Sequence, residues 1–256
     1  MFGFLIKKAF FDTWDHLLPA IGVNLVFIAI LAVPILLPPV LVEIQPVAGI
    51  VALVAGILLL FVFLGGASAF ALEVVDYHSI EVRSLLRGAT SQYRTSLVFG
   101  LLVLLHLTLV GIALPVYSQM GNLFGLFAMA ILFWLSVIWM LMWVYIHPVR
   151  GRLNVETLKV LKKSFLLVLD NPFYSLFVGL GGVVILVVSL FTAFLLPGIA
   201  GVMIWFHAAV KLRLYKYDYL EEHPEKGPIP WDVLLYDDRE RVGKRTLRGM
   251  IFPWKE

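Results

Sequence analysis

The feature that most constrains this chain is a series of long apolar runs. A helix of about 20 residues crosses the hydrocarbon core of a bilayer, which is roughly 30 Å thick. Five runs reach the length of a span: 17 to 37, 47 to 75, 97 to 116, 123 to 147 and 173 to 196. A sixth, shorter run, residues 198 to 215, follows Pro197 directly and ends among basic residues. The sequence therefore predicts an all-α integral membrane protein with six transmembrane helices.

The composition and the charge distribution agree with this interpretation. Hydrophobic residues make up 61% of the chain, against about 45 to 50% in soluble domains. Lys and Arg lie before the first run, between the second and third, between the fourth and fifth, and from Lys211 onward, and the opposite connections carry none. By the positive-inside rule both termini are expected to be cytoplasmic. The first run is too long for a cleavable signal peptide and should remain as the first helix.

Two similar segments indicate an internal repeat. KKAFFDTWDH, starting at Lys7, aligns with KKSFLLVLDN, starting at Lys162, and LLRGATSQYR, starting at Leu85, is a weaker middle copy. We expect three tandem repeats, about residues 1-77, 78-152 and 153-216, each made of an interfacial amphipathic helix and a helical hairpin. The first helix of each hairpin is expected to end at a Leu-Pro pair: Leu37-Pro38, Leu114-Pro115 and Leu196-Pro197.

The interfacial helices place lysines beside apolar residues at helical spacing, as in LKVLKKSFLLVL. Such helices lie at the boundary of headgroups and acyl chains. One interpretation is binding of the lipid bilayer through anionic headgroups at the cytoplasmic face. The other is that these helices only fix the tilt of the hairpin that follows.

Three polar residues stand within the apolar runs and are candidates for lining a cavity: His106, His207 and Asn24. A polar group in hydrocarbon must turn inward and find a partner. The two histidines are expected near mid-membrane depth, where they would act as a proton relay or contact a solute, or else each make one interhelical hydrogen bond. Two histidines without a carboxylate are too few for a zinc site, so no metal and no cofactor are expected.

Catalytic signatures are not found in the sequence. It contains no GxSxG, Walker A or HExxH motif, no cysteine, and no spaced pair of carboxylates within the apolar runs. The chain is therefore expected not to be an enzyme.

The tail, residues 217-256, is too short for an independent core. Residues 221 to 230 form a linker rich in Pro and charge, and WDVLLYDDRERVGKR is expected to form a short amphipathic helix. The end interleaves basic, aliphatic and aromatic residues without a fold to present them to nucleic acid. It is expected instead to dock on the cytoplasmic loops or on a partner through Arg248, Ile251, Phe252 and Trp254.

Several segments resemble the YesL-type family of small bacterial polytopic membrane proteins: LLPAIGVNLVFIAILAVPILLP, FWLSVIWMLMWVYIHPVRGR and KKSFLLVLDNPFYSLFVGLGG. The similarity covers about residues 1 to 216 and implies a bacterial plasma (inner) membrane protein that accompanies carbohydrate uptake systems. The expected function is thus an accessory or scaffold subunit of a membrane complex, with subunits of a carbohydrate ABC transporter as possible partners. The alternative is an independent carrier of a small solute or lipid with a midplane polar cavity.

Overall fold

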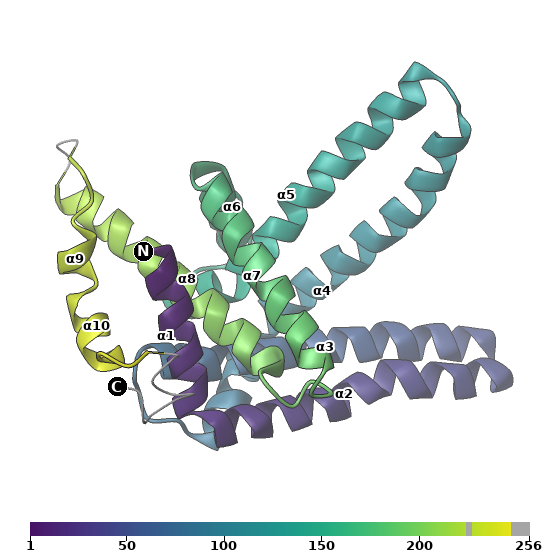
Figure 1. Ribbon diagram of the computed structural model, residues 1–256. Coiled ribbons are helices and arrows are strands. Elements are labelled where there is room, and N and C mark those ends of the chain that lie inside the picture. The colour runs from purple at the N-terminus through teal and green to yellow at the C-terminus, as the bar shows by residue number, and fades with distance from the viewer. Residues whose placement is uncertain (224–226, 247–256) are drawn as a thin grey trace.

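The computed structural model describes residues 1–223 and 227–246, and within these ranges the chain folds into helices joined by short turns (Figure 1). No strand occurs among the described residues. The helices are α1 (Phe2–Asp15), α2 (Leu17–Ile44), α3 (Pro46–Val75), α4 (Val82–Gln119), α5 (Leu123–Leu153), α6 (Thr157–Asp170), α7 (Pro172–Leu190), α8 (Gly198–Glu222), α9 (Trp231–Leu234) and α10 (Tyr236–Val242).

Five helices are long and apolar enough to cross a membrane: α2, α3, α4, α5 and α7. The chain is therefore an all-α, multi-pass membrane protein. The predicted sixth span corresponds to α8, which is not among these five, so six spans are not confirmed. Polar residues such as His207, Lys211 and Arg213 lower the mean hydropathy of α8.

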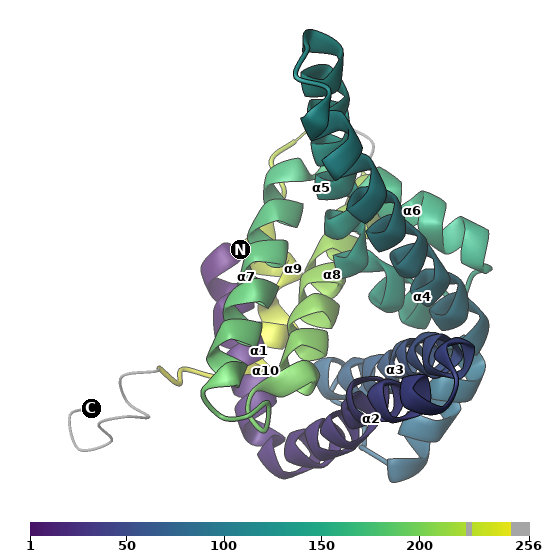
Figure 2. The ribbon, with the colours of Figure 1, turned by 90° about the vertical axis from the view of Figure 1, so that its right-hand side faces the viewer.

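Helix α8 is the central helix of the bundle. It contacts α1, α2, α3, α5 and α7, and most of its residues from Gly198 to Arg213 are buried. Its surface thus faces protein instead of lipid, so it does not need the apolar composition of a lipid-facing span. In Figure 2, α8 lies beside α7, with α1 on one side and the α4–α5 pair on the other.

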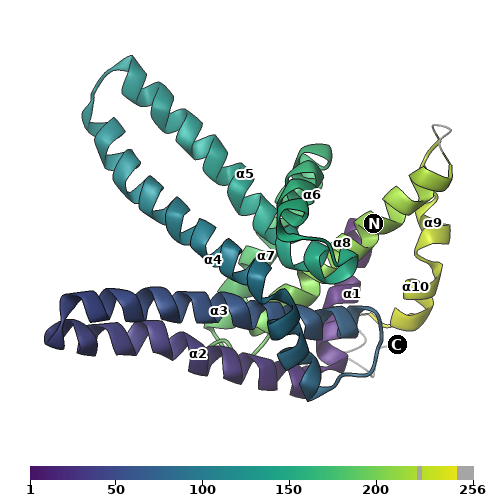
Figure 3. The same cartoon turned by 180° about the vertical axis from the view of Figure 1, so that it is seen from behind.

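The two long hairpins diverge from a common base. Helices α2 and α3 form one hairpin and α4 and α5 the other, and Figures 1 and 3 show their far ends pointing apart. At the base, small residues bring α3 and α4 into close contact, because a Cβ added to Gly66 would lie 2.6 Å from the Leu85 carbonyl oxygen. The core sits at this base, where side chains such as Phe70, Tyr145 and Ile204 are almost fully buried.

Two of the predicted Leu-Pro helix ends are wrong. Helix α2 continues through Pro38 and Pro39 to Ile44, and α4 continues through Pro115 to Gln119. Proline is tolerated inside membrane helices when neighbouring groups form hydrogen bonds with the backbone groups that proline leaves unbonded. The third pair, Leu196-Pro197, lies in the turn between α7 and α8, but α7 already ends at Leu190, before the predicted position.

The predicted interfacial helices are only partly separate elements. Helices α1 and α6 have 14 residues each, and each ends at an aspartate just before the next helix begins. The middle copy, LLRGATSQYR, has no break after it and forms the first turns of the continuous α4. The threefold repeat therefore stays a prediction.

The tail docks on the bundle. The predicted amphipathic helix forms as two short helices, α9 and α10, and Leu235 between them and Asp238 and Val242 of α10 are buried. Helix α10 contacts α1, and Lys7 Nζ donates a hydrogen bond to the Gly243 carbonyl oxygen at 2.8 Å. The first helix and the described part of the tail thus lie on the same face of the protein.

Candidate functional site

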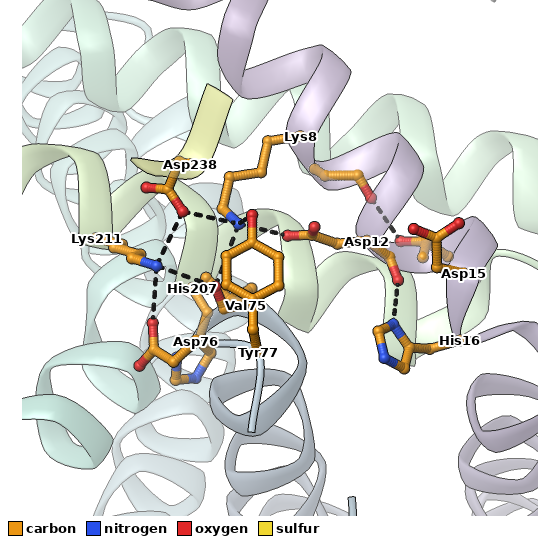
Figure 4. Close-up of polar contacts among 12 residues, drawn as sticks. Lys8, Asp12, Asp15, His16, Val75, Asp76, Tyr77, His207, Lys211 and Asp238 are labelled. Carbon is orange, nitrogen blue, oxygen red and sulfur yellow. Dashed lines mark hydrogen bonds and ion pairs between the residues drawn. The ribbon is translucent and has the colours of Figure 1, made fainter. Parts of the chain in front are cut away.

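The most unusual polar feature of the structure begins at Lys8 on α1. This side chain is 0% exposed. Its Nζ lies 2.9 Å from an Asp12 carboxylate oxygen one turn further along α1 and 3.4 Å from Asp238 of α10. It also donates hydrogen bonds to the Val75 carbonyl oxygen and the Tyr77 hydroxyl oxygen at the end of α3. One ammonium group therefore joins the two ends of the described chain to the base of a hairpin (Figure 4).

A second cation, Lys211 of α8, occupies the other side of Asp238. Its Nζ lies 3.1 Å from Asp238 and 3.3 Å from Asp76. Arg152, at the end of α5, donates to both carboxylate oxygens of Asp76 at 3.0 and 3.2 Å. These contacts link three cations and three carboxylates into what we call the ion cluster: Lys8, Asp12, Asp76, Arg152, Lys211 and Asp238.

Each element delivers its charge at a helix end or on a buried face. Asp76 is the residue that ends α3, so its carboxylate projects beyond the hairpin base. Asp238 lies in the first turn of α10, where a carboxylate is favoured by the helix dipole. Lys8 and Asp12 are spaced i,i+4 on the face of α1 that packs inward, the spacing at which helical side chains meet.

Burial and the neighbouring charges determine the protonation of the carboxyl groups outside the spans. Burial raises the pKa of Asp12 from 3.8 to about 6, although the adjacent Lys8 ammonium opposes this change. Burial also acts to raise the pKa of Asp238, but Lys8 and Lys211 outweigh it and the pKa is lowered. Burial, followed by the nearby Asp12 and Asp238 charges, raises the pKa of Tyr77.

The ion cluster holds elements of the fold together. Its three positive and three negative groups balance in charge. Removing one of them would leave a buried charge without its partner and would lower the stability of the fold. The cluster ties α1, α3, α5, α8 and α10 at one place, so docking of the tail depends on the same contacts as packing of the hairpins. The cluster was not predicted from the sequence, and one of the two interpretations placed the lysines of the interfacial helices at lipid headgroups. Lys8 is instead buried, and the i,i+4 pair with Asp12 was the signal available in the sequence.

The two candidate histidines are not brought together. His207 is 0% exposed, and its Nε2 lies 2.8 Å from the Ser68 hydroxyl of α3. His106 is half-buried on the far part of α4, with its ring centroid 6.4 Å from that of Trp139. Gln92 of α4 lies beside His207, since both come within 4 Å of a Cβ added to Gly151. His106 is four turns further along α4, about 20 Å at 1.5 Å per residue, so the two histidines do not form one site.

The third candidate, Asn24, binds the turn between α7 and α8. Its Nδ2 donates to the carbonyl oxygens of Leu195 and Pro197 at 2.9 Å each, and its Oδ1 accepts from the Ala200 amide at 2.9 Å. Asn24 lies only two turns into α2, so this turn stays near the start of α2 and does not reach its far end. That geometry explains why His207 lies nearer the base than its position after Pro197 suggested.

One apolar pocket of about 620 Å³ lies between α1, α7 and α8. Its walls include Phe10 and Trp14 of α1, Leu180 and Val184 of α7, and Trp205 of α8. His106, His207 and Asn24 do not line it. The apolar lining fits a hydrocarbon chain, and none of the three candidate residues could contact a polar solute there.

The predicted docking residues at the chain end, Arg248, Ile251, Phe252 and Trp254, lie outside the described residues. No group of three or more metal-binding side chains occurs in the part of the chain that the structure describes. No protein-family model, curated protein or solved structure matches this chain.

Proposed function

We propose that the protein is a non-enzymatic accessory or scaffold subunit of a membrane complex, and that its diverging hairpins pack against transmembrane helices of a partner. The resemblance to YesL-type proteins suggests a carbohydrate ABC transporter as that complex. The single observation that carries the proposal is the α4–α5 hairpin.

The far half of this hairpin has few contacts with the rest of the protein. Helix α4 packs against α3 near the base and the two helices then separate, as Figure 3 shows. No charged residue occurs between Arg94 and Arg150. Apolar side chains are exposed along both helices, among them Leu105, Leu109, Ile112, Val116, Phe124, Phe127, Phe133 and Trp134. Lipid alone can cover such a surface, but a projecting pair of helices also offers a partner helix more area than a compact bundle does.

Gly111 gives this surface a place for close packing. It is exposed in the far half of α4, and a Cβ added there would meet nothing within 4 Å. Small residues at such positions let helix backbones approach closely in membranes, where association depends on van der Waals packing. We infer that a partner helix crosses α4 at Gly111.

The proposal includes a topology and an origin for the fold. Both termini are cytoplasmic in a bacterial plasma membrane, which is supported by the one-sided distribution of Lys and Arg and by the contact of α10 with α1. The first and third units descend from one repeat, which is supported by the equal length of α1 and α6 and by their matching aspartate ends.

The test is quantitative co-purification in mild detergent of the full-length protein and its Gly111→Leu variant. The leucine enters open space, so the fold is unchanged while the contact is blocked, and recovery of transporter subunits should fall at least fivefold. Gly22→Leu is the matched control, because Gly22 of α2 is also exposed with nothing within 4 Å of an added Cβ. Equal recovery with all three proteins, or recovery of no membrane subunit by any of them, would reject the proposal.

A further inference from the structure

Several buried polar atoms near the base of the α4–α5 hairpin have no hydrogen-bond partner among the described residues. His147 of α5 is 2% exposed, and neither of its ring nitrogens is bonded. The Ser96 hydroxyl and Gln92 Oε1 of α4 are likewise buried and unbonded. His207 bonds Ser68 through Nε2, and its Nδ1 has no partner. We call these four residues the polar seam: Gln92, Ser96, His147 and His207.

The polar seam is one place, formed where α3, α4, α5 and α8 converge. A Cβ added to Gly151, one turn beyond His147, would lie 3.4 Å from His207 Cε1 and 3.7 Å from Gln92 Nε2. A Cβ added to Gly65 of α3 would lie 2.8 Å from Ser96 Oγ. The Phe99 ring, one turn beyond Ser96, lies 5.6 Å from the His147 ring. At these two glycines the backbones of α3 and α5 thus approach Ser96, His207 and Gln92 closely, which places these groups side by side.

A dry seam would be costly. Each unsatisfied buried donor or acceptor loses its interaction with water and gains nothing in exchange. Buried polar groups in proteins are almost always bonded to protein or to ordered water, and a buried water requires two to four polar partners. The seam offers one acceptor at Gln92, a hydroxyl at Ser96 and one donor and one acceptor on a neutral His147 ring.

We propose that the polar seam binds a small cluster of internal water molecules that bridges His147, Ser96, Gln92 and the free nitrogen of His207. The cluster extends toward the cytoplasmic end of the fold. Arg152, which pairs with Asp76 in the ion cluster, comes within 3.4 Å of the His207 carbonyl oxygen and keeps an unbonded Nε. Water in the seam therefore connects the buried histidines with the charged groups beneath the docked tail.

The experiment is X-ray radiolytic labelling of the full-length protein in nanodiscs, because hydroxyl radicals formed from bound water oxidise the side chains beside it. Tyr145 is the matched control: it lies two residues before His147 on α5, is 0% exposed, and its hydroxyl is bonded to Ser175 Oγ at 2.7 Å. A second control is Trp205, which is 4% exposed with its Nε1 bonded to the Val178 carbonyl oxygen. After correction for intrinsic reactivity, His147 should be oxidised at least threefold faster than either control.

Oxidation of His147 at the rate of Tyr145 and Trp205, or below it, would overturn the proposal. A second measurement uses His147→Leu, a change of similar size. If the seam is hydrated, the leucine removes partners from the water cluster and the melting temperature falls. If the seam is dry, the leucine removes two unsatisfied groups and the melting temperature rises, which would also overturn the proposal.

Discussion

Lys8 is the residue at which the account of the ion cluster can be tested most strictly. Its ammonium group is 0% exposed and contacts Asp12 and Asp238, which are 4% and 2% exposed. Lys8→Met keeps the aliphatic stem but deletes the charge. Asp238 retains Lys211 at 3.1 Å, whereas Asp12 keeps no ion-pair partner among the described residues. Breaking a buried pair by removing one partner costs about 3 to 5 kcal/mol, and we expect the free energy of unfolding to fall by this amount at pH 7.

The assay is denaturant titration in mixed micelles followed by circular dichroism. Lys159→Met is the control, because Lys159 pairs with Glu156 at 65% and 82% exposure and such a pair contributes about 0 to 1 kcal/mol. The double variant Lys8→Met/Asp12→Leu should recover most of the loss, since replacing a buried pair by apolar residues is often neutral. A single variant as stable as wild type, or a double variant no better than the single one, would refute the reasoning.

Three further predictions concern the carboxyl group of Asp12, the hydrogen bonds of Asn24 and the docking of α10. The pKa of Asp12 is about 6 in the fold and 3.8 in the unfolded chain, so the folded protein binds the proton more tightly. The free energy of unfolding of wild type should therefore fall relative to that of Asp12→Asn as pH rises from 4 to 6, by up to about 3 kcal/mol. A difference in unfolding free energy that does not change with pH would contradict this. Asn24→Leu should lower the free energy of unfolding by about 1 to 3 kcal/mol, since it removes three hydrogen bonds of the strength found inside membranes; an unchanged titration would show that the bonds do not hold the α7–α8 turn. Val242 is 1% exposed, and Val242→Cys places a single thiol at this position of the cysteine-free chain. The thiol should react with a hydrophilic maleimide at least tenfold faster in the double variant Val242→Cys/Asp238→Ala than in Val242→Cys alone. Equal rates would contradict docking of the tail through Asp238.

The sequence was sufficient for the parts of the fold that depend on long apolar runs. The five runs from Leu17 to Leu190 all appear as helices, because a bilayer requires every backbone group of a span to be bonded within it. The helical region from Trp231 onward was also predicted, although as one helix, and the structure divides it into α9 and α10. Proline does not mark these two helix ends, because Pro38 and Pro115 both lie inside continuous helices.

The candidate site was less predictable, because it depends on which helices meet. In the sequence, Lys8 and Asp12 resemble ordinary surface charges, and Asp238 is far from both. The three residues are buried together where α10 docks on α1. His207 was identified as a buried polar residue and is one, but its neighbours come from α3, α4 and α5. His147 was not predicted as a site residue, although both of its ring nitrogens are buried without a hydrogen-bond partner among the described residues.

The most direct test of the scaffold proposal is site-specific photo-crosslinking in native membranes. A photoreactive residue in place of Leu107, which is 58% exposed and lies one turn from Gly111 on the same face of α4, should give a discrete adduct with a transmembrane subunit of a transporter. The same residue in place of Phe173, 85% exposed at the start of α7, should give lipid adducts without that band. Lipid adducts alone at both positions would contradict the account.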